Sequence, residues 1–381
     1  MRIYESIIQS EMDAPILRRR TISGWRMTLT AMAILASTTG VCLAQRPGSD
    51  DAFLPSPVIS TSTVPTNGDV NPYGVAFVPN NFQTGSGPLL HGDILVSNYN
   101  NSANLQGTGT TIVRISKTGK TSLFFQGTAP LGLSTALGTL QYGFIVVGNS
   151  PTVDGTSATA GRGSLLVINN QGKLIQRFVN DSIQGPWDMA LVDNGDSAIA
   201  FLSNALDGTV VRLNFSVTSK GLTLLSQTRV ASGYVHHGDP VTLFVSPTGL
   251  VYDQRRDVLY VASAGDNAVF AVGEAASRQS SDGLGTIIYQ DNVHLHGALG
   301  LAIAPNGHLL VSNSDGVNAD PSQPSEIVEF TTDGTFVKEL SVDPSGGGSF
   351  GLAVRSFGDT SIFAAVDDNT STLLIWTLNM D

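Results

Sequence analysis

The stretch "HGALGLAIAPNGHLLVSNSDG", His296–Gly316, decides the fold. It contains two short apolar segments joined by a Pro-Asn-Gly turn, and the second segment ends in Ser-Asn. Similar units recur along the chain, so that six second segments end at Asn98, Asn149, Asn204, Ser263, Asn313 and Asp367. Register positions in the first segments, Gly74, Gly132, Asp188, Gly249, Gly300 and Gly351, are 51 to 61 residues apart. A period of this length indicates a repeat architecture.

Each period holds more than two strands. A third apolar segment follows every pair, and a fourth follows in five of the six copies. Four short strands per period predict an all-β fold, a six-bladed β-propeller with four-stranded blades. The last copy lacks a fourth strand, while "PVISTSTV" at 57–64 is a strand without a repeat. We expect this strand to complete the last blade beside "TLLIWTL" at 372–378 and to close the ring. A β-sandwich with chance similarity between segments is the alternative.

The N-terminal region is expected to lie outside the fold. Basic residues in "ILRRRTISGWR" precede an apolar segment at 27–44, which predicts a signal peptide over 1–44 with cleavage after Ala44. An uncleaved anchor, translation from Met12 or Met27, and Sec or twin-arginine export stay open. Residues 45–70 form an N-terminal segment with the closing strand, and 71–381 form the propeller. The expected location is secreted or periplasmic, with no membrane contact after cleavage.

Composition excludes several kinds of site. Cys42 lies in the leader and is the one cysteine, so the mature chain has no disulfide, thiolate zinc site or cysteine nucleophile. The whole chain has a net charge of −11 from 20 basic and 31 acidic residues. The first 44 residues hold five basic and three acidic residues, so the mature charge is −13. A nucleic acid partner is therefore not expected.

The consensus of the repeat, a small residue followed by Gly-Leu-Ala, a Pro/Asn-Gly turn and "VSN", resembles NHL-repeat six-bladed propellers over residues 71–379. The resemblance implies architecture more than function. The chain also resembles gluconolactonase-like and streptogramin-lyase-like propellers in fold, without their metal and catalytic residues. Tyr73, Leu131, Trp187, Thr248, Leu299 and Phe350 stand where the first family would place metal ligands. His296-Gly297 lies three residues before the position that the second family's His-Gly motif would occupy.

Polar residues end the six second strands, which bring them to one face of the propeller. Asn98, Asn149, Asn204, Asn313 and Asp367, with Ser263, could bind a hard cation or a polar ligand such as a sugar. Alternatively, each caps its own turn through a hydrogen bond to the backbone. On the same face, Tyr73, Trp187 and Phe350 stand at the channel mouth. They could stack a sugar or a planar ligand, or plug the channel as packing.

Histidines gather in one sector of this face. His236, His237 and Asp239 precede the inner strand of blade four, and His294 and His296 precede that of blade five. Imidazoles could bind a transition metal or act as a general base. Ordinary hydrogen-bonded loop histidines are the alternative. We expect His237 and His296 to approach each other if the sector is a site.

Long connections between the second and third strands of blades one, two and five predict walls of a cleft. The connection of blade five offers Asp315, Asn318 and Asp320 to calcium, but without the spacing of an EF-hand loop. The sequence thus predicts an exported module that binds a small-molecule, glycan or protein ligand on one face. A metal-assisted hydrolase or lyase that uses the histidine sector is the alternative. No cofactor is certain, and a divalent metal is possible.

Overall fold

The computed structural model describes residues 51–55, 59–322, 324 and 326–379. The predicted signal peptide and its cleavage position lie outside these residues. Within the described part of the chain, no helix has the length and apolar character needed to span a membrane.

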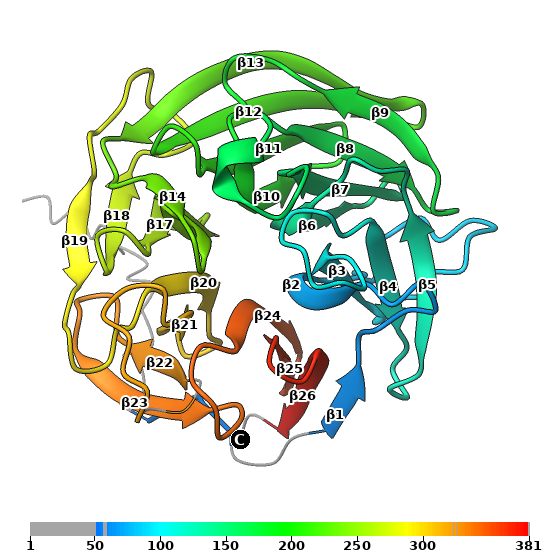
Figure 1. Ribbon diagram of the computed structural model, residues 1–381. Coiled ribbons are helices and arrows are strands. Elements are labelled where there is room, and N and C mark those ends of the chain that lie inside the picture. Colours follow the sequence, from blue (N-terminus) through cyan, green and yellow to red (C-terminus); the bar gives the residue numbers. More distant parts are fainter. Residues whose placement is uncertain (1–50, 56–58, 323, 325, 380–381) are drawn as a thin grey trace, which may run out of the picture. The chain divides into compact units, whose positions relative to one another are not determined.

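Six four-stranded antiparallel sheets are arranged as blades around a central axis (Figure 1). The fold is therefore a six-bladed β-propeller, as predicted. Blade one contains β2 (Val70–Phe77), β3 (Ile94–Asn100), β4 (Thr111–Ile115) and β5 (Thr121–Gln126). Blade two contains β6 (Leu133–Leu140), β7 (Phe144–Asn149), β8 (Ser164–Asn169) and β9 (Leu174–Phe178). Blade three contains β10 (Pro186–Asp193), β11 (Ser197–Asn204), β12 (Thr209–Thr218) and β13 (Gly221–Ser232).

The remaining blades follow the same order from the channel outward. Blade four contains β16 (Pro247–Asp253), β17 (Val258–Ser263), β18 (Ala268–Gly273) and β19 (Thr286–Tyr289). Blade five contains β20 (Ala298–Ile303), β21 (Leu309–Asn313), β22 (Glu326–Phe330) and β23 (Phe336–Ser341). Blade six contains β24 (Ser349–Phe357), β25 (Thr360–Asp367), β26 (Thr372–Asn379) and, as its outer strand, β1 (Ile59–Ser62).

The N-terminal strand closes the ring, as the sequence predicts. β1 runs antiparallel to β26, with Ile59 opposite Ile375 and Ser62 opposite Thr372. Just beyond β1, the Asn98 side chain of blade one donates a hydrogen bond to the Thr63 carbonyl oxygen at 3.1 Å. The closing segment thus links the first blade to the last, which a ring without disulfides needs.

The register glycines allow neighbouring inner strands to approach each other. A Cβ atom on Gly351 would lie 1.9 Å from the carbonyl oxygen of Tyr73, and one on Gly300 would lie 2.3 Å from that of Phe350. In blade five, the serine that precedes the final asparagine of the "VSN" segment joins neighbouring inner strands through hydrogen bonds. The Ser312 hydroxyl accepts a hydrogen bond from Gly300 N at 2.8 Å and donates one to the Phe350 carbonyl oxygen at 2.6 Å. The repeat therefore encodes contacts between blades, not only strands.

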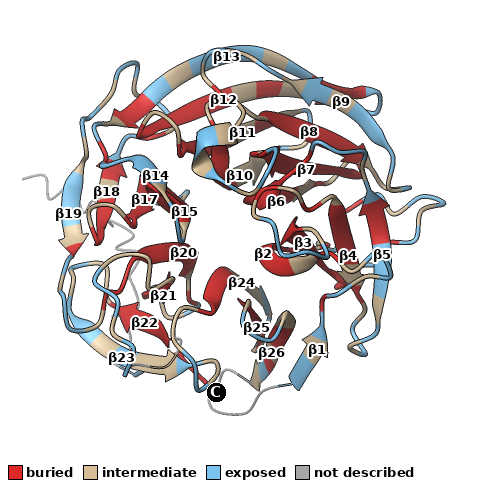
Figure 2. Cartoon of the chain, in the orientation of Figure 1, coloured by how far each residue is buried: buried red, intermediate tan, exposed pale blue. Residues whose placement is uncertain are grey.

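Apolar side chains fill the spaces between adjacent blades. The inner and middle strands are largely buried, whereas the outer strands β9, β13, β19 and β23 have many exposed residues (Figure 2). One core cluster surrounds the channel mouth and includes Tyr73, Trp187, Leu299 and Phe350. Packing between inner strands therefore fixes the positions of the residues that start them.

Two further elements come from the connections. β14 (His237–Asp239) and β15 (Leu243–Val245) form a hairpin before blade four, and η1 (Ser157–Thr159) is a 3-10 turn in the long connection of blade two. The sequence predicts a long connection before blade four but not the hairpin, because strands of three residues give no periodic pattern.

Candidate functional site

A pocket of about 270 Å³ lies where the inner strands begin. We call it the loop-face pocket. Residues before or at the start of inner strands line it, and residues from the connections of blades one, four, five and six complete it. They are Asn71, Tyr73, Asn100, Asn104, Gln106, Trp187, Val241, Thr242, Phe244, Val245, Ala264, Leu299, Ser314, Gly316, Gly347, Phe350 and Asp368.

Aromatic rings form one part of the loop-face pocket. The ring centroids of Tyr73 and Phe350 are 4.7 Å apart in a stacked arrangement. Trp187 meets Tyr73 edge-on at 5.6 Å and Phe244 at 5.7 Å. These rings pack together in the core cluster, as the packing alternative predicts, and they also line the pocket; their stacking on a ligand stays a prediction.

Hydrogen-bonding groups form the remainder of this pocket. Three buried polar atoms on its lining residues have no partner among the described residues: Asn71 Oδ1, Asn100 Oδ1 and Trp187 Nε1. Asn71 also adopts a left-handed backbone conformation, with φ of 60°. Buried polar atoms without partners are costly, because they lose their hydrogen bonds to water. They are therefore candidates for contacts with a ligand, and because each atom is itself buried, such a contact requires a small movement of its side chain.

Among the described residues that line the pocket, Asp368 contributes the one carboxylate. Its side chain makes no hydrogen bond to any described residue, although its backbone N–H donates to the Gly348 carbonyl oxygen at 2.8 Å. Burial, followed by the charge of Asp367, raises the pKa of Asp368 to about 7. None of the described residues that line the pocket is Lys, Arg or His. The pocket consequently disfavours anions.

The β14–β15 hairpin and the long connection of blade one meet over the channel mouth. Gln106 Nε2 donates a hydrogen bond to the Val241 carbonyl oxygen at 2.7 Å. Thr242 and Phe244 of the hairpin line the pocket beside Ser314 of blade five. The prediction of cleft walls from long connections is met by blades one and five. The connection of blade two contacts the hairpin through η1 but does not line the pocket.

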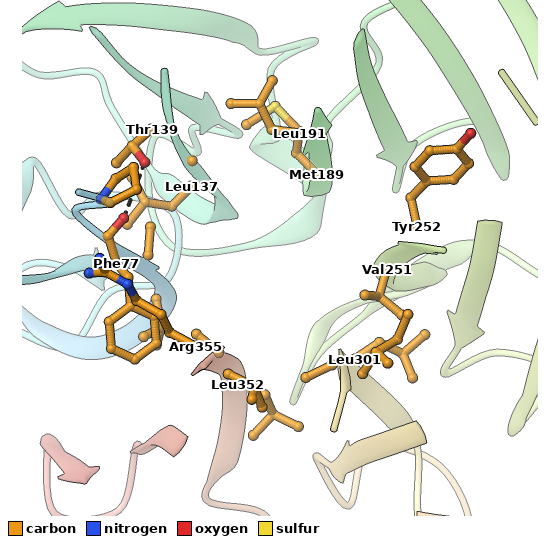
Figure 3. Close-up of a pocket in the computed structure, with 18 residues that line it drawn as sticks. Phe77, Leu137, Thr139, Met189, Leu191, Val251, Tyr252, Leu301, Leu352 and Arg355 are labelled. Atoms are coloured by element: carbon orange, nitrogen blue, oxygen red, sulfur yellow. Dashed lines mark hydrogen bonds between the residues drawn. The ribbon is translucent and has the colours of Figure 1, made fainter. Parts of the chain in front are cut away.

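A second cavity, of about 480 Å³, lies where the inner strands end (Figure 3). Its lining is mainly apolar, with Leu137, Met189, Leu301 and Leu352 from four blades. Its cation, Arg355, already donates hydrogen bonds to the Val78 carbonyl oxygen at 2.7 Å and to Asn80 Oδ1 at 2.8 Å. This cavity therefore has few free polar groups to orient a ligand.

The second-strand asparagines make structural hydrogen bonds. The Oδ1 atoms of Asn149, Asn204 and Asn313 accept from the backbone N–H groups of Gly132, Gln184 and His296, which precede the inner strands, at 2.9–3.0 Å. Their Nδ2 atoms donate to the first residue of the third strand. Asn98 donates to Thr63 and Thr111. These contacts differ from the capping of each residue's own turn. Their predicted ligand-binding role stays a prediction.

The two other second-strand residues have different partners. Ser263 Oγ donates to Asp266 Oδ2 at 2.6 Å. Asp367 accepts a hydrogen bond from the Thr370 hydroxyl, and its buried Oδ1 has no partner among the described residues. Burial and the neighbouring Asp343 raise the pKa of Asp367 to about 6. None of these six second-strand residues lines the loop-face pocket.

The predicted histidine sector divides into separate environments. His236 Nδ1 lies 2.9 Å from the Tyr234 carbonyl oxygen, and the exposed His237 has its Nδ1 3.0 Å from that of Gly238. His294 Nδ1 lies 2.8 Å from Asp291 Oδ2, and the Asp239 carboxylate accepts from Val241 N and Thr242 N at 2.8 Å. Across the described residues, no group of three potential metal ligands includes His236, His237, Asp239 or His294.

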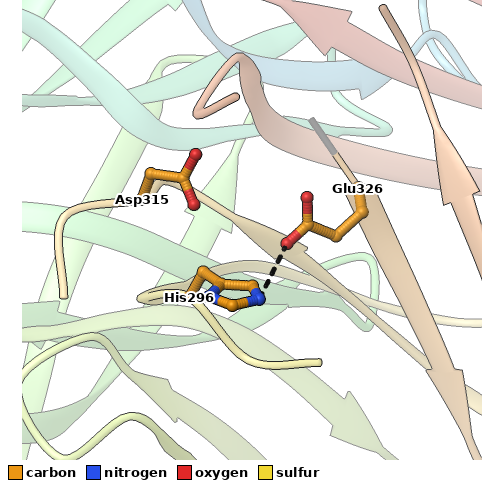
Figure 4. Close-up of side chains that lie close together, drawn as sticks. All are labelled: His296, Asp315 and Glu326. Atoms are coloured by element: carbon orange, nitrogen blue, oxygen red, sulfur yellow. Dashed lines mark ion pairs between the residues drawn. The ribbon is translucent and has the colours of Figure 1, made fainter. Parts of the chain in front are cut away.

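His296 belongs to a different group. Ligand atoms of His296, Asp315 and Glu326 all lie within 4.8 Å of one another (Figure 4). Burial raises the pKa of Glu326 to about 7 and also raises that of Asp315. Burial lowers the pKa of His296, but the Asn318 carbonyl and the charges of Glu326 and Asp315 raise it more, so the net shift is upward. Of the calcium candidates in this connection, Asp320 instead accepts from Ser322.

Sequence reasoning missed Asp368 and Glu326. Asp368 directly follows Asp367, the residue that ends the second strand of blade six. This position beside a predicted polar site was the signal in the sequence that could have indicated Asp368. Glu326 opens the third strand of blade five, where blades one, two and three have Thr111, Ser164 and Thr209. A position-by-position comparison of the repeats could have revealed this difference.

Comparison with known proteins supports the fold alone. No family model matches the sequence, and no curated protein matches it either. The structure is similar to a luciferin-regenerating enzyme, with a TM-score of 0.52, 11% identity and coverage of 85% of this chain and 95% of that chain. It is also similar to a Thermus thermophilus protein named as a candidate oxidoreductase (glucose dehydrogenase). That match has a TM-score of 0.50, 11% identity and coverage of 84% of this chain and 100% of that chain. The NHL assignment stays a prediction.

Proposed function

We propose that the propeller binds an uncharged, polyhydroxylated ligand of about monosaccharide size in the loop-face pocket. The observation that carries this proposal is the combination of an aromatic surface with buried polar atoms that lack partners among the described residues. Sugars present apolar C–H faces to aromatic rings and hydroxyl groups to amides and carboxylates. A cavity of about 270 Å³ is near the lower limit of ordinary ligand pockets.

The available groups match both hydrogen-bonding roles of a hydroxyl. Trp187 Nε1 is a donor, whereas Asn71 Oδ1 and Asn100 Oδ1 are acceptors. Asp368 adds an acceptor that becomes stronger when it is ionised. The described pocket lining offers no cation to an acidic ligand. Selectivity for neutral ligands follows from this charge distribution.

Hydrolysis or elimination acting on the same ligand is the second candidate function. The observation that favours it is the pKa of Asp368, which burial and Asp367 raise to about 7. A carboxyl group with this pKa can exchange a proton near neutral pH, as general acid–base catalysis requires. None of the histidines from the predicted sector lines the pocket, so this reaction would use Asp368 instead.

Two matched tryptophan substitutions test the position of the binding site. Trp187→Phe removes the Nε1 donor on the pocket lining and keeps an aromatic ring. Trp376→Phe removes a similarly buried Nε1 in blade six, outside the pocket, which also lacks a partner among the described residues. Isothermal titration with neutral monosaccharides should show affinity reduced up to about tenfold by Trp187→Phe, the cost of about one neutral hydrogen bond.

Trp376→Phe should leave that affinity unchanged. Equal losses in the two variants would contradict the proposed position. Failure of the wild-type protein to bind any neutral monosaccharide would contradict the proposal itself.

A further inference from the structure

Blade five departs from the repeat at the residue that opens its third strand. In blades one, two and three, the second-strand asparagine donates to a hydroxyl at this position: Asn98 to Thr111 at 3.3 Å, Asn149 to Ser164 at 3.2 Å, and Asn204 to Thr209 at 3.0 Å. In blade five, Asn313 Nδ2 instead donates to Glu326 Oε1 at 2.5 Å. A glutamate is not needed for this contact, because threonine and serine make it elsewhere.

Burial of the Glu326 carboxylate inside the protein is energetically unfavourable. Its side chain is 0% exposed, and Oε2 has no partner among the described residues. A buried carboxylate is unfavourable unless it is paired and its oxygens are hydrogen-bonded or bound to a cation. The unpaired oxygen therefore points to a ligand.

Two other potential ligands converge on Glu326 from separate segments. His296 precedes the inner strand, and Asp315 follows the second strand (Figure 4). His296 Nε2 lies 3.8 Å from Glu326 Oε1. Asp315 adopts a left-handed backbone conformation with φ of 50°, and its buried Oδ1 also has no partner among the described residues. Two carboxylate oxygens in the same small group thus lack partners in the described part of the chain.

The imidazole of His296 is oriented by its other nitrogen. Nδ1 lies 2.7 Å from the Asn318 carbonyl oxygen, where it can donate a hydrogen bond. A ligating histidine commonly donates one ring N–H to a carbonyl in this way, which leaves the lone pair of the other nitrogen for a metal. Nε2 lies 3.8 Å from Glu326 Oε1 and 3.2 Å from the Val293 carbonyl oxygen, so it ligates a cation only when it carries no proton and does not donate to Val293.

We propose that His296 Nε2, Asp315 and Glu326 bind one divalent cation of the Zn²⁺ or Mn²⁺ class. One nitrogen and two carboxylate oxygens suit these ions better than Ca²⁺ or Mg²⁺, which prefer oxygen ligands alone. Two ligand atoms at the tetrahedral angle on one such ion are about 3.3–3.6 Å apart, given bond lengths of about 2.0–2.2 Å. The observed ligand atoms lie within 4.8 Å of one another, so the widest pair must move closer by no more than about 1.5 Å when the ion binds.

This site goes beyond the proposed function, because none of its three ligands lines the loop-face pocket. It adjoins that pocket, however. Asp315 lies between Ser314 and Gly316, both of which line the pocket wall. A bound cation would therefore hold this part of the wall in place.

The test uses the full mature chain, stripped of metal by a chelator and titrated calorimetrically with Zn²⁺, Mn²⁺, Ca²⁺ and Mg²⁺. We expect one equivalent of Zn²⁺ or Mn²⁺ to bind and the melting temperature to rise. Glu326→Thr installs the residue of blades one and three, so it should fold and keep the hydrogen bond from Asn313. It should lower the affinity for the cation by about 100-fold or more, because loss of a ligand should cost at least as much as the 10–100-fold typical of replacing a residue that only orients one.

If Glu326→Thr fails to fold, Asp315→Asn is the second variant. Its affinity for the cation is measured in the same titration and should fall in the same way. Asp333→Asn, at an exposed carboxylate of the same blade, is the matched control and should bind the cation normally. Three results would overturn the assignment: no stoichiometric cation in the wild-type protein, unchanged affinity in the folded site variant, or preference for Ca²⁺ or Mg²⁺.

Discussion

Asp188 occupies the register position at which the other five blades carry glycine. Its carboxylate lies in the central channel, where Oδ2 accepts a hydrogen bond from Leu250 N of the next blade at 2.8 Å. Burial outweighs this hydrogen bond and that from Met189 N, and it raises the pKa of Asp188 from 3.8 to about 6. The ionised form of this residue therefore destabilises the folded protein.

The sign of this shift gives a pH-dependent prediction. Because the pKa is raised in the folded state, the stability associated with protonated Asp188 is present below about pH 4 and is lost as the pH rises through about 6. Asp188→Asn keeps an acceptor for Leu250 N and removes the charge. It should raise the free energy of unfolding at pH 8 by up to about 3 kcal/mol, and change it little at pH 4. Urea denaturation at the two pH values measures this; an equal effect at both would contradict the assignment.

At the scale of elements, the closing segment does more than supply the outer strand of blade six. The buried side chains of Phe53 and Leu54 pack in the cluster between blades five and six. The backbone N–H groups of both residues donate to the Glu329 carboxylate at 2.9–3.1 Å, and His308 Nδ1 lies 2.6 Å from the same carboxylate. This segment therefore covers a buried charged group as well as an exposed sheet edge.

Deletion of residues 51–64 should destabilise the propeller strongly. Burial of Phe53 and Leu54 stabilises the fold by about 1.5–3 kcal/mol for each side chain, and the deletion also removes partners of Glu329 and the β1 ladder. We expect a clearly lower thermal midpoint by circular dichroism. An unchanged midpoint would show that the ring does not depend on this closure.

The ends of the second strands were more predictable than the residues of the candidate site, because a polar residue at the strand end occurs in all six repeats. Of the second strands, β7, β11, β17, β21 and β25 end at the predicted residue, and β3 extends from Asn98 to Asn100. The asparagines recur because each makes hydrogen bonds inside the scaffold. Asp368 and Glu326 occur once each, and their significance depends on burial and on partners distant in sequence. Periodicity predicts shared contacts but not the exceptions.

At the scale of the whole molecule, the basic and apolar pattern of the N-terminal sequence supports a proposal that the protein is exported. The six-bladed scaffold needs no cysteine, because the closing strand joins its first and last blades. We propose cleavage after Ala44, which would remove Cys42 together with the leader. Mass spectrometry of protein from the periplasm or the medium should find an N-terminus near Gln45. Recovery from the cytoplasm with Met1 intact would contradict export.

The arrangement of the whole ring also determines what the loop-face pocket can bind. Inner strands and connections from several blades bring aromatic rings, amides and one carboxylate together, and the described pocket lining contributes no cation. Saturation-transfer difference NMR can compare neutral monosaccharides with the corresponding uronic acids, which differ mainly by one negative charge. The measurement is made at about pH 7.5, because burial raises the pKa of Asp368 to about 7 and its carboxyl group is then mostly ionised. We predict saturation transfer to at least one neutral sugar and none to its uronic acid. Transfer to the acid with equal or greater intensity, or to no sugar, would contradict the binding of a neutral polyhydroxylated ligand in this pocket.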